Sequence, residues 1–323
     1  MHAPDRIPGI GDFTQHSDLS PVSRRTLWLT GASGFLGAHL IPLLPMNEWR
    51  LALIPGRHPL PGVGAWTLHT TLTDDYGLRA VARGFRPDVI IHTAAISTVA
   101  ACRQNPQAAW EVNVRATRML AALARDLGAH LIHISTDMVF SGEHAPYAES
   151  ATPSPLSVYG YTKAAAEEAV QASGCQWTIL RCPLMYGLAR HPWHQNHLEL
   201  VLRGLRGTGE PPTLFRDEWR SLADVRQVAR TVVTAARRQT PGVYHLGGPE
   251  RLSRAGFARL ACSAFGIDPT RVREGSVRDA PGEPRPSDLT LISDRARAEL
   301  SYHHPPVAAT LEELADLLAV DRD

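Results

Sequence analysis

Three glycines spaced three residues apart, Gly31, Gly34 and Gly37, constrain this chain more than any other feature. They follow an apolar run at 26–30 that predicts a buried strand, and they open an apolar run at 35–44 that predicts a helix. Gly31 permits a tight turn, Gly34 lets the backbone approach an anion, and Gly37 lets the helix pack closely on the strand. The sequence therefore predicts a phosphate-binding loop at a helix N-terminus; a glycine-rich turn without a ligand is the alternative.

Strand and helix patterns alternate beyond this loop. Further strands are predicted at 51–54, 89–92, 131–134, 177–180 and 242–246, and helices at 108–127, 163–172, 198–205, 222–238, 252–265 and 310–320. Strands that alternate with helices form parallel sheets covered by helices on both faces. We therefore predict an α/β fold with a Rossmann-type, doubly wound parallel sheet.

Composition excludes several classes of protein. With 33 basic and 32 acidic side chains the net charge is +1, which gives no general electrostatic reason to bind nucleic acid or a membrane surface. No apolar run approaches the roughly 20 residues that span a bilayer, and no signal-peptide pattern is present. Four scattered cysteines without a CxxC pair favour reduced thiols in a cytoplasmic protein. Residues 1–24 lack any apolar period and are expected to form a disordered tail.

The residue that selects the dinucleotide is expected about 20 residues after the glycine loop, at the end of the second strand. The chain has Pro55-Gly56-Arg57-His58 there and no carboxylate. A carboxylate would hold the ribose hydroxyls of NAD, whereas the guanidinium of Arg57 suits the 2′-phosphate of NADP. We therefore predict NADP(H) as the cofactor; a solvated loop arginine is the alternative.

A tyrosine and a lysine four residues apart, Tyr159 and Lys163, share one face of a predicted helix. A nearby ammonium lowers the pKa of a tyrosine, so the pair can exchange a proton with a carbonyl or hydroxyl oxygen. Thr136 follows the strand at 131–134 and is placed to hydrogen-bond the same oxygen. Tyr161 lacks a lysine four residues on. Each feature alone is common, but their order on these elements predicts an oxidoreductase.

Two sequence blocks resemble the extended short-chain dehydrogenases/reductases, and most closely the dTDP-4-dehydrorhamnose reductases and related sugar-nucleotide-binding proteins. They are Ser135-Thr136-Asp137-Met138-Val139-Phe140-Ser141-Gly142, and Tyr159-Gly160-Tyr161-Thr162-Lys163 with Glu167. The resemblance implies an NADPH-dependent reductase of a keto group on a nucleotide-linked sugar, with Thr136, Tyr159 and Lys163 as the catalytic set.

The remaining site residues follow from the loop pattern and the resemblance together. The expected cofactor contacts are Gly31, Ser33, Gly34, Phe35, Leu36, Gly37, Arg57, Thr93, Ala94, Ala95, Asn113, Tyr159, Lys163, Arg181 and Pro183. The expected substrate contacts are Asp137, Met138, Trp219, Arg220 and Arg285. The resemblance also implies a cofactor domain at 25–187 and 212–248, a smaller, mainly C-terminal α/β substrate domain at 188–211 and 249–323, and a homodimer as one assembly the chain could form.

Two other functions fit the same fold. The family includes regulatory members that bind NADP without catalysis, and the intact Tyr159 and Lys163 favour an enzyme over such a subunit. An epimerase or dehydratase is the third alternative, although dehydratases usually place Asp-Glu after the threonine and this chain has Asp137-Met138.

A triplet of histidines, His191, His194 and His197, has the spacing HxxHxxH. Pro192 interrupts it, and no acidic ligand has suitable spacing, so we expect a polar loop near the substrate and no metal site.

We expect the protein to bind NADPH more tightly than NADH, because Arg57 can form a charge-assisted contact with the 2′-phosphate. Arg57→Ala should narrow the difference by about 1–3 kcal/mol. Titration of each reduced cofactor against both proteins measures this difference. Equal affinities in the unsubstituted protein would contradict the assignment of Arg57.

Overall fold

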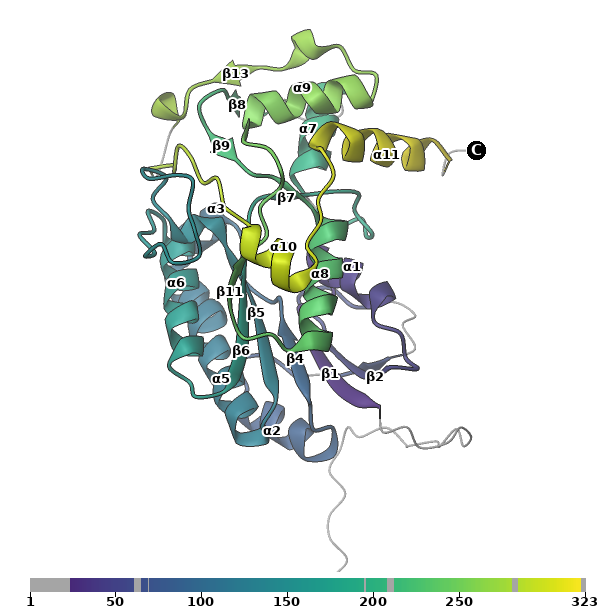
Figure 1. Cartoon of the computed structure of the whole chain (residues 1–323), viewed down its shortest axis with the longest axis vertical. Coiled ribbons are helices and arrows are strands. Elements are labelled where there is room, and N and C mark those ends of the chain that lie inside the picture. Colours follow the sequence, from purple (N-terminus) through teal and green to yellow (C-terminus); the bar gives the residue numbers. More distant parts are fainter. Residues whose placement is uncertain are drawn as a thin grey trace, which may run out of the picture.

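The computed structural model describes residues 24–60, 65–68, 70–194, 196–207, 212–280 and 284–320, so the predicted tail at 1–24 lies outside this part except for Arg24. Seven parallel strands form the central sheet (Figure 1). Their spatial order is β3-β2-β1-β4-β5-β6-β11, which is the doubly wound order expected of a Rossmann fold. The bounds are β1 Arg25–Thr30, β2 Trp49–Ile54, β3 Trp66–Thr67, β4 Val89–His92, β5 His130–Thr136, β6 Gln176–Cys182 and β11 Gly242–His245. The predicted fold class is confirmed.

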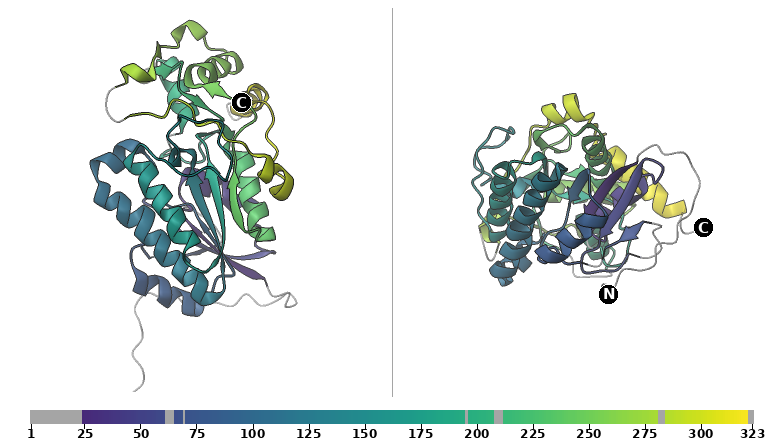
Figure 2. Two further views of the ribbon diagram at one scale, coloured as in Figure 1. Left: turned by 60° about the vertical axis from the view of Figure 1, so that its left-hand side comes forward. Right: turned by 90° about the horizontal axis from the view of Figure 1, so that it is seen from below.

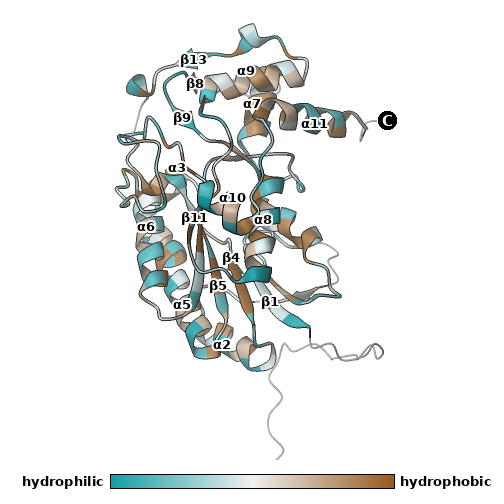
Figure 3. Ribbon diagram, in the orientation of Figure 1, coloured by the Kyte–Doolittle hydropathy of each residue, from teal (hydrophilic) through white to brown (hydrophobic). Residues whose placement is uncertain are grey.

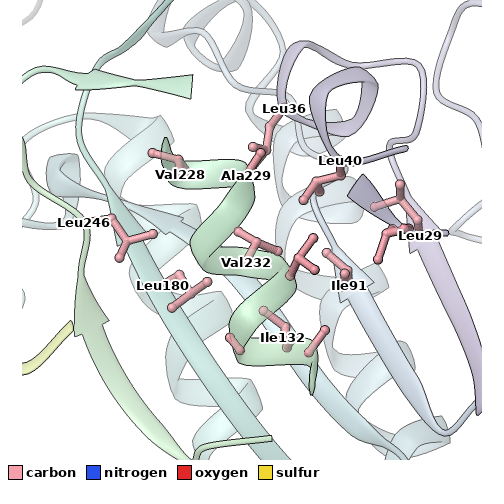
Figure 4. Close-up of a cluster of buried hydrophobic side chains, with 14 of the residues drawn as sticks. Leu29, Leu36, Leu40, Ile91, Ile132, Leu180, Val228, Ala229, Val232 and Leu246 are labelled. Carbon is pink, nitrogen blue, oxygen red and sulfur yellow. The ribbon is translucent and has the colours of Figure 1, made fainter. Parts of the chain in front are cut away.

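The central strands are largely buried and rich in apolar residues because helices cover both faces of the sheet (Figure 2). On one face, α1 (Phe35–Leu40), α8 (Val225–Arg238) and α10 (Asp294–Leu300) pack on alternate strand residues, among them Leu29, Ile91, Ile132 and Leu180 (Figure 4). On the other face, α2 (Asp75–Gly84), α5 (Ala116–Leu127) and α6 (Val158–Gln171) pack on the intervening residues, among them Trp28, Ile90, Leu131 and Ile179.

Hydropathy follows this layering. Figure 3 shows hydrophobic, brown stretches on the central strands, whereas α5 and α6 carry teal residues on their outer surfaces. The period of two in the strands therefore divides the core into two clusters, one on each face of the sheet. No helix in the described ranges combines the length and the apolar character needed to cross a membrane.

Some helices differ from the prediction. The helix expected at 108–127 consists of α4 (Pro106–Trp110), a π-helical turn at Glu111–Arg115 and α5. The helix expected from residue 222 begins at Val225, because the Asp224 side chain accepts a hydrogen bond from the Arg226 N–H and caps the helix there. Helix α2 was not predicted, since it is mostly polar and its buried residues are only Leu78 and Ala82.

A second lobe lies beyond the carboxyl ends of the strands (Figure 1). It contains α7 (His197–Leu205), α9 (Arg254–Ala264), α11 (Val307–Val320) and the two-residue strands β8 (Leu214–Phe215) and β13 (Glu274–Gly275), which pair with each other. Buried side chains of α7, α9 and α11 form its core. The short strands β9 (Trp219–Arg220) and β12 (Leu252–Ser253) pair at its base, and β7 (Met185–Tyr186) pairs with β10 (Ala223–Asp224) between lobe and sheet.

Further short helices complete the described part of the fold. They are α3 (Val99–Gln104) and the 3-10 turns at Ile41–Leu43, Asp137–Val139, Pro269–Arg271 and Val277–Asp279. The division of the chain into a cofactor domain and a substrate domain stays a prediction. Residues 214–220 pair with segments of the lobe, and the chain rejoins the sheet through α8 and β11.

Leu180→Ala should lower the free energy of unfolding by about 2–5 kcal/mol, because Leu180 is fully buried between β6 and α8 and its loss leaves a cavity. Leu317→Ala on α11 is the matched control, since Leu317 is 46% exposed, and should change stability by about 0.5 kcal/mol or less. Chemical denaturation of the three proteins gives the comparison. Similar losses in both variants would show that this cluster is not the core.

Candidate active site

A groove of about 660 Å³ opens at the carboxyl ends of β1, β2, β4, β5 and β6. Segments that are far apart in the sequence meet along it, as parallel strands require. Most of the predicted cofactor and catalytic residues line it: Gly31, Ser33, Gly34, Phe35, Leu36, Arg57, Thr93, Ala94, Ala95, Thr136, Tyr159, Lys163 and Pro183. The glycine loop occupies one part of the groove and the tyrosine–lysine helix another.

The glycine loop needs glycine for three different reasons. Gly31 has φ +68°, and a Cβ there would lie 2.6 Å from Thr93 Oγ1 and 2.7 Å from the Ala94 nitrogen. A Cβ on Gly37 would clash with the carbonyl oxygen of Gly31, which confirms that α1 packs closely on the loop. Gly34 is the N-cap of α1, so the helix start carries no side chain over the groove.

A loop from the second lobe holds this glycine loop in place. The Ser33 carbonyl accepts hydrogen bonds from Trp193 Nε1 (3.1 Å) and His194 Nε2 (2.9 Å). The Trp193 ring stacks on the His58 ring, with 4.9 Å between the ring centres, and on the His191 ring, with 4.6 Å between the ring centres. The sequence predicted a polar loop here but not these contacts, because neither the stack nor the bonds have a local pattern.

The HxxHxxH triplet runs from this loop into the first residue of α7, and its histidines have different partners. His197 Nε2 accepts a hydrogen bond from Arg254 Nε at 3.1 Å, whereas His194 contacts the Ser33 carbonyl. Within the described ranges, no three His, Cys, Asp or Glu side chains are grouped to hold a metal ion.

Tyr159 lies in the first turn of α6, which the Ser157 hydroxyl caps by accepting from the Gly160 N–H. Its hydroxyl forms a hydrogen bond with the side chain of Thr136, at the end of β5. Burial raises the pKa of Tyr159 above its ordinary value, and the bond to Thr136 opposes this only in part. The expected lowering by Lys163 is therefore not seen: desolvation dominates, and Lys163 is not among the main influences on this hydroxyl.

Lys163 is buried one turn further along α6, and it is the only lysine among the 33 lysines and arginines of the chain. Its Nζ donates to the Ile134 carbonyl at 2.7 Å and lies 3.0 Å from His133 Nε2. Burial lowers the pKa of Lys163 to about 8, while the charge of Glu167 opposes the shift. His133 was not predicted; a histidine in the middle of a buried strand was the available signal.

Three predicted cofactor residues do not line the groove: Gly37, which packs on the glycine loop, and Asn113 and Arg181. Asn113, in the π-helical turn, accepts from the Ile96 N–H and donates to the Ile96 carbonyl, so it shapes the segment after β4. Arg181 forms a buried ion pair with Glu167 at 2.8 Å, and Glu167 also accepts from Ser135. Asn113 and Arg181 both support the lining segments from behind.

The predicted substrate residues gather where the lobe meets the end of β5. Asp137 Oδ2 lies 3.8 Å from Arg220 Nε, and Arg220 pairs with Glu218, which also pairs with Arg285. Burial raises the pKa of Asp137 to about 6 despite the charge of Arg220. Met138 and Trp219 flank this group: the Met138 N–H donates to Thr136, and the Arg251 guanidinium lies 3.9 Å from the Trp219 ring centre. The buried Glu218, which forms ion pairs with these arginines, was not predicted.

Comparison with known proteins identifies the family. The model of the RmlD substrate binding domain matches residues 25–320, which is nearly the whole described chain. The chain belongs to the RmlD substrate binding domain family. The relatives of this RmlD-family chain include a dTDP-4-keto-6-deoxy-D-glucose reductase from Streptomyces niveus, 36% identical over 84% of this chain and 90% of the relative. They also include the methionine adenosyltransferase 2 subunit beta of Xenopus laevis, 30% identical over 86% of this chain and 83% of the relative.

Solved structures support the fold of this RmlD-family chain. A hypothetical dTDP-4-dehydrorhamnose reductase from Sulfolobus tokodaii superposes with a TM-score of 0.76, at 28% identity over 88% of this chain and 98% of that one. The dTDP-4-dehydrorhamnose reductase of Bacillus anthracis in complex with NADP gives a TM-score of 0.78 at 24% identity, over 91% and 99% of the two chains.

Trp193→Ala should weaken NADPH binding about two- to tenfold, because it removes a hydrogen bond and the ring stack that hold the glycine loop. Trp110→Ala is the control, since Trp110 is 48% exposed on α4 and does not line the groove. Fluorescence titration with NADPH measures both. If both variants bind as tightly as the parent, the lobe loop does not organise the cofactor site.

Proposed function

We propose that this protein is an NADPH-dependent reductase of a keto group on a nucleotide-linked sugar. One observation carries the proposal: Thr136, Tyr159 and the only lysine of the chain line the same groove as the glycine loop and Arg57. This arrangement supports a proton donor and a dinucleotide-binding loop along one groove.

The groove suits a dinucleotide in its shape and in its charge. Gly31 leaves a space that any Cβ would fill, and α1 starts beside it with no side chain on its N-cap. Arg57 lines the other side, and no carboxylate follows it at the end of β2. We propose that the glycine loop holds the diphosphate, Arg57 the 2′-phosphate and Lys163 the nicotinamide ribose. The bound NADPH would supply the hydride.

The side chains at the tyrosine end supply the proton. Burial raises the pKa of Tyr159, so its hydroxyl is protonated at neutral pH and can donate to a carbonyl oxygen only if the phenolate that forms is stabilised. Thr136 already contacts this hydroxyl and can donate a second hydrogen bond to the same oxygen. The phenolate left behind needs a nearby cation, and Lys163, one helical turn away, can provide it.

A nucleotide-linked sugar is the substrate class that the neighbouring charges favour. Arg220, Arg254 and Arg285 surround Glu218, and Asp137 is the second carboxyl of the group. Three guanidiniums against two carboxyl groups leave a positive balance, which suits a diphosphate. The Streptomyces niveus relative, a dTDP-4-keto-6-deoxy-D-glucose reductase, supports a keto-sugar carried on a nucleotide.

A second candidate is a non-catalytic regulatory subunit, which the methionine adenosyltransferase 2 subunit beta relatives favour. The presence of Tyr159, Thr136 and Lys163 in one groove argues for catalysis instead. Met138 after Asp137 argues against a dehydratase. We also keep a cytoplasmic location as part of the proposal, since all four cysteines lie in the described ranges and form no disulfide. The homodimer stays a prediction.

Tyr159→Phe should keep the fold and the affinity for NADPH but reduce the rate of keto-sugar reduction by a factor on the order of 10²–10⁴, because a general acid is lost. The measurement is NADPH oxidation with a panel of nucleotide-linked keto-sugars. Tyr161→Phe is the matched control: Tyr161 is two residues away on α6 and 61% exposed, so its loss should be mild.

Two outcomes would decide against this assignment. An active Tyr159→Phe together with an inactive Tyr161→Phe would place the proton donor elsewhere. NADPH binding without turnover of any keto-sugar by the unsubstituted protein would favour the regulatory subunit.

A further inference from the structure

A buried histidine lies directly behind the candidate catalytic lysine. His133 is fully buried on β5, and its Nε2 lies 3.0 Å from Lys163 Nζ. An ammonium has only donors, so in this contact Nε2 must accept and the ring proton must sit on Nδ1. Burial and the charge of Lys163 hold the pKa of His133 well below its ordinary value, so the ring is neutral and able to accept.

The other ring nitrogen of His133 has no partner. Its Nδ1 is buried without a hydrogen bond in the described part of the chain. A buried unpaired N–H is costly and rare in native proteins, so its presence here needs a reason. An apolar side chain would avoid the cost, but it could not accept from Lys163.

The neighbouring histidine shows what a purely structural histidine looks like in this sheet. Thr117 donates to the Asn113 carbonyl, so it accepts from His92 Nε2, and His92 Nδ1 accepts from Thr30. Both nitrogens of His92 are therefore paired, although its ring centre is only 5.4 Å from that of His133. His133 differs from His92 because its Nδ1 has no hydrogen-bond partner in the described ranges, while its Nε2 accepts from Lys163.

We propose that His133 is a positioning residue for Lys163: its Nε2 and the Ile134 carbonyl take two of the three ammonium N–H groups and direct the third into the groove. The hydrogen bonds to Ile134 and His133 fix the head group from the sheet side. The remaining N–H is then the one that can reach a ribose hydroxyl or the Tyr159 oxygen.

No carboxylate in the described ranges forms an ion pair with Lys163, so the direct hydrogen bonds of its ammonium go to neutral acceptors, while the charge of Glu167 acts without contact. The titratable groups that face it are Glu167 on its own helix, Cys182 on β6, Cys102 on α3 and the neutral His92 on β4. Glu167 is already occupied by Arg181 and Ser135.

The sign of the effect follows from these contacts. An acceptor at His133 stabilises the charged form of the lysine and so raises its pKa, whereas burial lowers that pKa to about 8. Removing the acceptor should therefore move the titration of Lys163 to lower pH.

The single lysine makes this directly measurable. Protein grown with [13C]ε-lysine should give one side-chain resonance, and its chemical shift against pH reports Lys163 alone. We expect a midpoint near pH 8 in the unsubstituted protein. His133→Leu should lower the midpoint by roughly one to two pH units, the worth of a hydrogen bond to a charged group.

Two further variants separate positioning from a general structural role. His133→Gln keeps an acceptor at similar reach and should restore the midpoint to within about half a pH unit of the parent. His130→Leu removes a buried histidine at the first residue of β5, where its Nε2 forms a hydrogen bond with Thr178. This change should leave the midpoint of the Lys163 titration unchanged. A midpoint in His133→Leu equal to the parent, or a shift in His130→Leu of the same size, would overturn the proposal. If His133→Leu does not fold, the His133→Gln variant decides. A midpoint of the Lys163 titration one to two pH units below the parent overturns the proposal, and a midpoint equal to the parent supports it.

The functional consequence rests on the proposed function. At pH 8, His133→Leu should bind NADPH at least about fivefold more weakly than the parent and recover most of the loss at pH 6, where Lys163 is charged again. A loss that is the same at both pH values would show structural damage rather than loss of charge. If the parent does not bind NADPH at all, the proposed function fails, while the lysine titration still decides the role of His133.

Discussion

Parallel pairing of the strands is the constraint on which the candidate site depends. Because β1, β2, β4, β5 and β6 run in one direction, their carboxyl ends meet at one edge, and the glycine loop, Arg57, Thr93 and Thr136 all follow those ends. Parallel sheets require helices on both faces, and these helices bury the core from both sides. Residues far apart in the sequence, such as Gly31 after β1 and Thr136 after β5, thereby line one groove.

A buried ion pair fixes the position of α6, the helix that carries Tyr159 and Lys163, along the strands of the sheet. Arg181 on β6 holds Glu167, which is one turn beyond Lys163 on α6, and Glu167 also binds Ser135 on β5. Such a pair is not in itself strong evidence of stability, but removal of one partner costs about 3–5 kcal/mol because the other charge is left buried. The pair therefore ties α6 to β5 and β6 at one register, which places Tyr159 beside Thr136.

The sequence predicted the elements that have a local signal. Every predicted strand is present within two residues at each end, because an apolar run between turn residues can be recognised without knowing which strands or helices pack against it. The glycine loop and the tyrosine–lysine pair also depend on short spacings. His133, Glu218 and the Trp193 contact to Ser33 were not predicted, since each takes its role from a residue on another element. The raised pKa of Tyr159 was missed for the same reason: spacing reveals the nearby lysine but not the burial.

The retention of one lysine in a chain otherwise supplied with arginine follows from the same burial. An arginine keeps its charge at any accessible pH, but its planar fork is larger than an ammonium and needs several acceptors in one plane. Behind the groove there are two acceptors, the Ile134 carbonyl and His133 Nε2, and they converge on a single point at 2.7 and 3.0 Å. A compact head group with three divergent donors fits this geometry and leaves one donor for the groove. Exposed positions impose no such requirement, and the buried Arg181 and Arg220 each have a carboxylate partner, whereas the two converging neutral acceptors at position 163 favour a compact ammonium.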